Sequence, residues 1–196
     1  MDLIETSTVS DGALPVDALR AHLRLGTGFA DETTGDALLM QYLRAALAAI
    51  EARTGKALFV RDFLMTLSRW RWSDAQALPL APVSAVAAVT LRDATGAPTL
   101  IDAARYRLVI DRHRPQIIAT GAVLPQVPPS GSVEIAFTAG FGTTWEAIPD
   151  DLRQAVMLLA AQYYEARTGA EAGLPARIEA LVSRWLPMRV TAGGHR

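Results

Sequence analysis

The chain has 196 residues, of which 51% are hydrophobic and 20% are charged, a composition typical of a folded protein with one sizeable core. Its 19 lysine and arginine residues nearly balance its 20 aspartate and glutamate residues, and a net charge of -1 gives no general attraction to nucleic acid or to anionic lipid. The absence of cysteine excludes disulfides, thiolate metal sites and cysteine nucleophiles, and no stretch reaches the roughly 18 apolar residues of a membrane span.

The first part of the chain is predicted to be helical, after a flexible arm at residues 1–13. Pro15 marks the start of a short helix over Val16–Leu25. A long helix is predicted over Ala37–Arg53, because its apolar residues recur at three- and four-residue spacing: Leu39, Leu43, Ala46, Leu47 and Ile50. Such a helix must bury one face.

From Leu58 onward the pattern changes from helical to alternating, and glycine and proline become frequent. Short runs that alternate apolar with polar residues, separated by turn residues, are typical of antiparallel sheets and small barrels. The strands predicted in this way are Phe63–Leu67, Val86–Arg92, Thr99–Ile101, Tyr106–Ile110, Gln116–Ala119 and Ser132–Thr138.

A second long helix is predicted over Pro149–Thr168, and a short final helix over Ala176–Leu186. The two long helices end on the same five letters, at Glu51–Gly55 and at Glu165–Gly169. Glycine is common where a helix ends in a left-handed residue, and arginine in the last turn suits the negative end of the helix dipole. Convergence on one stop signal explains the repeat, and an internal duplication remains the alternative.

These elements predict an α+β fold with a helical core of two long and two short helices and an inserted antiparallel β-sheet or small barrel. The core is expected to comprise residues 14–57 and 147–187, and the β insert residues 58–146. A basic tail of small residues at 188–196 has no means of forming a core of its own.

Reactive side chains do not cluster in the sequence. The three histidines, His22, His113 and His195, have no second ligand at metal-binding spacing, and no serine-hydrolase elbow is present. Asp150 and Asp151 stand at the start of a predicted helix, where carboxylates act as caps. Gly140–Gly142 lacks the lysine and the hydroxyl residue of a phosphate-binding loop and is interpreted as a tight turn. We therefore predict no catalytic, metal or cofactor site.

The run Arg69, Trp70, Arg71 and Trp72 interleaves cations with aromatic rings. On a strand, both tryptophans would share one face and both arginines the other. Tryptophan and arginine are enriched at the energetic centres of protein interfaces, so we predict a subunit contact. The same composition occurs on surfaces that bind single-stranded nucleic acid, which gives an alternative function as a small single-stranded nucleic-acid-binding module.

The order of segments resembles that of the head-to-tail connector (adaptor) proteins of tailed bacteriophages and gene transfer agents, in the longer branch with a β insert. The resemblance covers about Leu14 to Leu186, and it rests on order and spacing. The residues that carry it are Leu14–Arg24, Ala45–Ala46, Glu51–Leu58, Leu78–Val83, Tyr106, Val133–Gly142, Ile148–Pro149 and Tyr164–Arg167. The proline-rich segment before Ser132 and the loop Thr143–Glu146 depart from the common pattern.

The resemblance implies a structural protein without catalysis or cofactor. It implies a homo-oligomeric ring, commonly of about twelve copies, that binds the portal protein on one side and a tail-side connector or stopper protein on the other. DNA would pass through the ring without specific binding. The location implied is the head–tail junction of a virion or phage-like particle assembled in the bacterial cytoplasm, with no membrane contact.

The portal-binding residues are predicted from physical chemistry, because the resemblance does not identify them. The end of the chain is apolar and cationic and shows no partner within its own sequence, so it would gain one by binding a neighbour. The residues predicted to bind the portal are Ile178, Leu181, Arg184, Trp185, Leu186, Met188 and Arg189.

Overall fold

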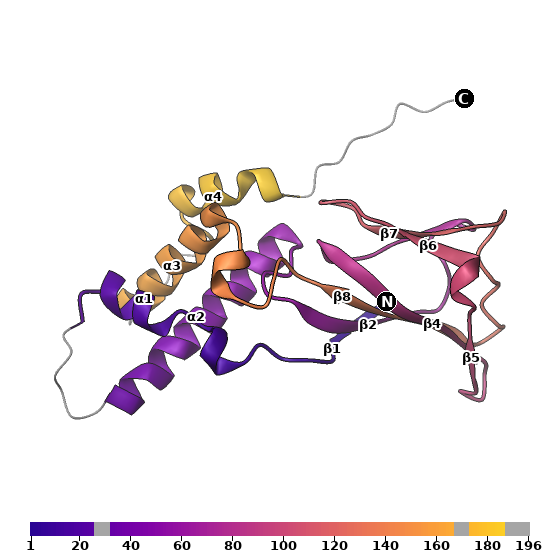
Figure 1. Cartoon of the computed structure of the whole chain (residues 1–196), viewed down its shortest axis with the longest axis horizontal. Helices are drawn as coiled ribbons and strands as arrows, with labels where there is room; N and C mark the ends of the chain where they lie inside the picture. The colour runs from indigo at the N-terminus through magenta and orange to yellow at the C-terminus, as the bar shows by residue number, and fades with distance from the viewer. Residues whose placement is uncertain (26–31, 167–172, 187–196) are drawn as a thin grey trace.

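The computed structural model describes residues 1–25, 32–166 and 173–186. Helices gather at one end of an elongated molecule and two β-sheets at the other (Figure 1). The α+β class and the count of two long and two short helices are confirmed. The helices are α1 (Val16–His22), α2 (Glu32–Thr54), α3 (Asp150–Glu165) and α4 (Ala176–Val182), and a single 3₁₀ turn, Ser183–Trp185, extends α4.

The helical end has its own hydrophobic core. The apolar stripes of α2 and α3 face each other, and α1 and α4 add one side each. Burial of the apolar side chains between the helices is the main contribution to helix stability, because isolated helices of this length are only marginally stable in water. The fully buried side chains at the centre are Leu19, Leu43, Ile50, Leu152, Val156, Ile178 and Val182.

The end of α2 has the predicted glycine stop. Gly55 adopts φ 65°, the left-handed conformation that glycine takes without strain. The Thr54 hydroxyl is buried and donates to the Ile50 carbonyl oxygen at 2.7 Å. In the second copy of the motif, α3 ends at Glu165, and Arg167–Gly169 lie outside the described residues.

The larger sheet has five antiparallel strands in the order β1 (Asp2–Glu5), β2 (Arg61–Leu67), β8 (Ser132–Ala139), β4 (Val83–Arg92) and β5 (Pro98–Leu100). The smaller sheet has the order β3 (Ala75–Ala77), β7 (Gln116–Ala119) and β6 (Tyr106–Val109). Alternate residues of β2 and β8 point into a second hydrophobic core, to which the buried Ile117 of the smaller sheet also belongs. The insert is therefore a pair of antiparallel sheets that share one core.

The N-terminal segment differs from the expected flexible arm. Asp2–Glu5 pairs with β2 along its whole length, and Asp11–Ala13 forms a 3₁₀ turn. The prediction missed β1 because a four-residue edge strand with a single inward side chain shows no alternation, and pairing with β2 is what stabilises it. The strand β3 is even shorter and was missed for the same reason.

Two neighbouring segments connect the helices to the sheets. Leu58–Val60 lead out of the helical end and Gly140–Gly142 lead back, joined by hydrogen bonds from Val60 N to Gly142 O at 2.9 Å and from Phe141 N to Leu58 O at 3.2 Å. Gly140 has φ 138°, and a Cβ there would lie 2.3 Å from the Phe59 carbonyl oxygen. The expected tight turn is therefore a close backbone crossing that only glycine can occupy.

Candidate functional site

Clusters of metal ligands and membrane spans are two features that could mark a site in the described residues. Within residues 1–25, 32–166 and 173–186, no three histidine or acidic side chains converge as metal ligands would. None of the helices in this part of the chain combines the length and the apolar character that a membrane span needs. The candidate site is therefore sought among surfaces that could receive another protein.

The indole of Trp185 is held by three parts of its own chain. Its Nε1 donates to the Asp151 carboxylate at 2.7 Å, and its ring packs edge-on against Phe141 at a centroid distance of 5.4 Å. The guanidinium groups of Arg184 and Arg112 lie 4.8 and 5.9 Å from the ring centroid. Cations over an indole are attracted by its ring electrons. The last 3₁₀ turn is thereby joined to α3 and to the turn between β6 and β7.

This arrangement corrects the argument made for the C-terminal residues. Ile178 and Trp185 are buried in the helical core, so the expectation that the stretch lacks a partner in its own chain is wrong for both. Leu181 and Leu186 are half-buried. Arg184 keeps 67% of its side chain exposed although its Nε is 2.6 Å from the Asp151 carboxylate. Portal binding by the exposed members stays a prediction, and two of the predicted residues, Met188 and Arg189, lie outside the described part of the chain.

The segment Arg69–Trp72 is not a strand, so the separation of tryptophans and arginines onto two faces that a strand would give does not occur, and the subunit contact stays a prediction. The segment forms bends between β2 and β3, because the pairing of β2 with β8 ends at Leu67. Trp70 packs on the sheet core and its Nε1 donates to the Pro125 carbonyl oxygen at 2.8 Å. Trp72 is 61% exposed, with the Arg71 guanidinium 5.8 Å from its ring centroid. Only one of the two tryptophans is free to meet a partner.

Clefts of about 750 and 510 Å³ flank this segment. The first is lined by Met1 and the end of β2, and the second by Val123, Leu124 and Val127. Val123 is 53% exposed, which leaves an apolar surface beside Trp72. A bent backbone with one projecting indole suits a protein contact better than a flat stacking platform, which needs successive aromatic faces.

Buried charges lie where the helices meet the sheets. Glu51, from the repeated motif, accepts a hydrogen bond from Leu58 N at 2.6 Å and pairs with Arg61, which also pairs with Glu5 at 2.9 Å. Burial raises the pKa of Glu51, although Arg61 and the Leu58 amide favour its charged form. Lys56 is 1% exposed and its Nζ donates to the Arg112 carbonyl oxygen at 2.7 Å. Burial lowers the pKa of this lysine.

A further cleft, of about 780 Å³, opens beside α1. Its lining comes from residues 10–18, from Asp36 and Met40 of α2, and from the loop 143–146 before α3. Three of the carboxylates that line the cleft form ion pairs with arginine side chains: Asp11 pairs with Arg44, and both Asp17 and Asp36 pair with Arg20. Glu146 is exposed and forms no ion pair with any described residue. The cleft is acidic and partly apolar.

Three of these residues were not identified as functional from the sequence. Asp151 was interpreted only as a cap, Glu51 only as part of a stop motif, and Arg112 not at all. Two carboxylates follow Pro149, one more than a helix cap requires, and this surplus was the sequence signal that Asp151 has a second role. No local pattern indicates the contact of Arg112 with Trp185, because the two are far apart in the sequence.

No protein-family model matches the chain, and no curated protein matches it either. Three solved chains cover 98% of this chain, and it covers 99% of each of theirs.

The first, at 56% identity and a TM-score of 0.89, comes from the neck of an empty gene transfer agent particle computed with C6 symmetry. The second, at 55% and 0.87, comes from the virion of a native gene transfer agent particle. The third, at 51% and 0.85, comes from the neck of a native particle computed with C12 symmetry. Identity above one half over nearly the whole length leaves no room for a different fold or family: the chain belongs to the structural neck proteins of gene transfer agent particles.

Proposed function

We propose that the chain is the head–tail adaptor of such a particle, a subunit of a ring that lies between the portal and the tail and continues the DNA channel. The observation that carries this proposal is the similarity to a neck chain at 56% identity and a TM-score of 0.89. The match covers 98% of this chain and 99% of the neck chain. Relatives solved with C6 and C12 symmetry favour a ring of identical copies, and twelve is the smallest number of copies compatible with both symmetries.

The chemistry of the subunit agrees with a passive wall around DNA. A net charge of -1 gives little affinity for phosphates, so translocating DNA would not be gripped. We assign the chain no catalytic role and no cofactor. The exposed alanines of α2, Ala45, Ala48 and Ala52, would let a neighbouring backbone come close.

Two surfaces remain our proposals for partners. Arg184 and the residues that follow α4 would bind the portal, and Arg71 with Trp72 would contact a neighbouring subunit at the sheet end. The opposite side of the ring would receive a tail-side connector or stopper protein.

The test is a producing strain in which the gene is deleted and restored in trans. Particles made without the chain should contain DNA-filled or emptied heads without attached tails, and gene transfer should fall to background. Averaged images of the restored particles should show a ring at the junction. Tailed, active particles from the deletion strain would refute the proposal.

A further inference from the structure

The turn between β6 and β7 projects a short basic tip, Ile110–Arg114. Ile110 is 72% exposed, and the side chains of Arg112 and Arg114 are also exposed. Arg184, whose guanidinium lies over the same Trp185 ring as that of Arg112, adds to this charge, and Arg177 lies at the other end of α4. Arg114 and Arg177 form no ion pair with a carboxylate anywhere in residues 1–25, 32–166 or 173–186.

The tip is rigid before it meets a partner. The Asp111 carboxylate accepts hydrogen bonds from the backbone N–H groups of His113 at 2.7 Å and Arg114 at 2.6 Å, which closes the turn. The Lys56 Nζ donates a hydrogen bond to the Arg112 carbonyl oxygen, and the Arg112 guanidinium lies over the Trp185 ring. A loop that is already ordered loses little conformational freedom on binding.

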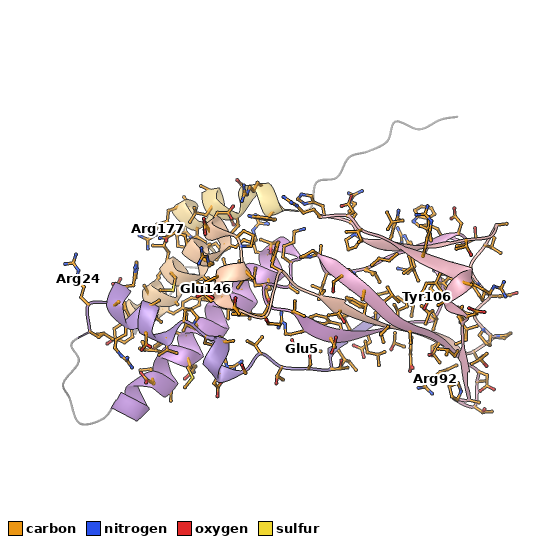
Figure 2. The ribbon with its side chains drawn as sticks, viewed as in Figure 1. Glu5, Arg24, Arg92, Tyr106, Glu146 and Arg177 are labelled. Carbon is orange, nitrogen blue, oxygen red and sulfur yellow. The ribbon has the colours of Figure 1, made fainter. Side chains whose placement is uncertain are left out.

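The acidic cleft lies on the other side of the helical end. In Figure 1, α4 and the β6–β7 hairpin run along the upper side of the molecule, whereas α1, which lines the cleft, lies below α4. Figure 2 shows Glu146 near the middle of the helical end, with Arg177 above it beside α4. The cleft offers half-buried apolar side chains for Ile110 and a carboxylate without an ion pair for Arg114.

We propose that the tip Ile110–Arg114 of one copy inserts into the cleft beside α1 of the next copy, forming a head-to-tail contact of the ring. This inference rests on the proposed ring, which supplies the occupant: a closed ring repeats one contact between two different, complementary faces. The faces complement each other in charge and both carry apolar groups. An isologous contact would bring tip against tip and oppose like charges, which disfavours it.

The absence of cysteine allows a direct test by disulfide crosslinking in restored particles. A disulfide forms only when two Cα atoms come within about 7 Å. The double variant Ile110→Cys with Glu146→Cys places one thiol on each face, so mild oxidation should give a ladder of covalent oligomers larger than a dimer. The matched control, Leu100→Cys with Glu146→Cys, uses an equally exposed apolar residue, 69% accessible, on another edge and should stay monomeric.

Charge reversal provides an independent measurement. Arg114→Glu and Glu146→Arg should each lower the amount of chain in purified particles about fivefold, and the double reversal should restore it. If wild-type chain is present in the particles but the cysteine pair gives no ladder and the double charge reversal gives no rescue, this inference is overturned and the proposed function is not. A dimer from Ile110→Cys by itself would show an isologous contact and also overturn it. Absence of wild-type chain from the particles would overturn the proposed function as well.

Discussion

The indole Nε1 of Trp185 donates to the carboxylate of Asp151 at 2.7 Å, and this hydrogen bond joins the last described turn of the chain to the first turn of α3. The same carboxylate accepts the guanidinium of Arg184 and the backbone N–H of Leu152. One acidic side chain thus holds Arg184 and Trp185 against the first turn of α3.

Removing that carboxylate should loosen the end of the chain. We expect Asp151→Ala to lower the free energy of unfolding by about 1–3 kcal/mol, because a buried indole N–H would lose its acceptor. Urea unfolding followed by tryptophan fluorescence measures the change. The matched control is Asp150→Ala, which removes an exposed pair with Arg153 and one charge from the first turn of α3 and should cost under about 1 kcal/mol. Equal effects of the two substitutions would contradict the role given to Asp151.

The crossing at Gly140 should not tolerate a side chain. Gly140→Ala would place a Cβ 2.3 Å from the Phe59 carbonyl oxygen, and we expect a loss of about 2–4 kcal/mol in unfolding free energy. Gly35→Ala is the control: a Cβ there meets nothing within 4 Å in α2, and helix propensity predicts a gain of about 0.5 kcal/mol. Thermal unfolding of both variants measures the two changes in stability. A Gly140→Ala protein as stable as the wild type would refute the close approach of Gly140 to the Phe59 carbonyl oxygen.

The two tryptophans of the Arg69–Trp72 segment should behave differently. Trp70→Ala removes packing on the sheet core and should cost about 2 kcal/mol or more, whereas Trp72→Ala should change stability by less than about 0.5 kcal/mol. If Trp72 contacts a neighbouring subunit, its loss should instead reduce incorporation into particles. Differential scanning calorimetry and quantification of chain per particle separate the two effects. Normal incorporation of Trp72→Ala would remove the segment from the ring contact.

The buried carboxyl of Glu51 should make stability depend on pH in a defined direction. Because burial raises the pKa of Glu51 above its ordinary value of 4.5, the folded chain holds this proton more tightly than the unfolded chain. The resulting stability is complete below the unfolded pKa and is lost as the pH rises through the folded one. Glu51→Gln lacks this dependence. The stability of wild type minus that of the variant should therefore fall as the pH rises above the ordinary glutamate pKa of 4.5. Urea titrations would measure the change, and a rising difference would refute the assignment.

The sequence predicted the long helices well because their burial pattern is local. The spacing of Leu39, Leu43 and Ile50 matched the buried face of α2, and the glycine stop at Gly55 was correct. The strand β7 was predicted at its observed bounds, whereas β1 was missed because its stability comes from β2.

The interaction surfaces were harder to predict because each depends on distant segments. The packing of Trp70 includes a hydrogen bond to Pro125, and whether Trp185 has a partner depends on Asp151 and Arg112. Neither relation leaves a periodic trace in the sequence. Among the residues predicted for partner binding, Ile178, Trp185 and the half-buried Trp70 pack within the subunit.

The paired backbone segments Leu58–Val60 and Gly140–Gly142 have an evolutionary consequence. Both connections of the insert to the bundle meet there, so its outer loops can be lengthened or trimmed while helix packing stays as it is. Changes to β2 or to the β6–β7 turn would also disturb β1 and Trp185. The outer loops of the insert are thus free to diverge between lineages, whereas the residues that contact β1 and Trp185 are constrained.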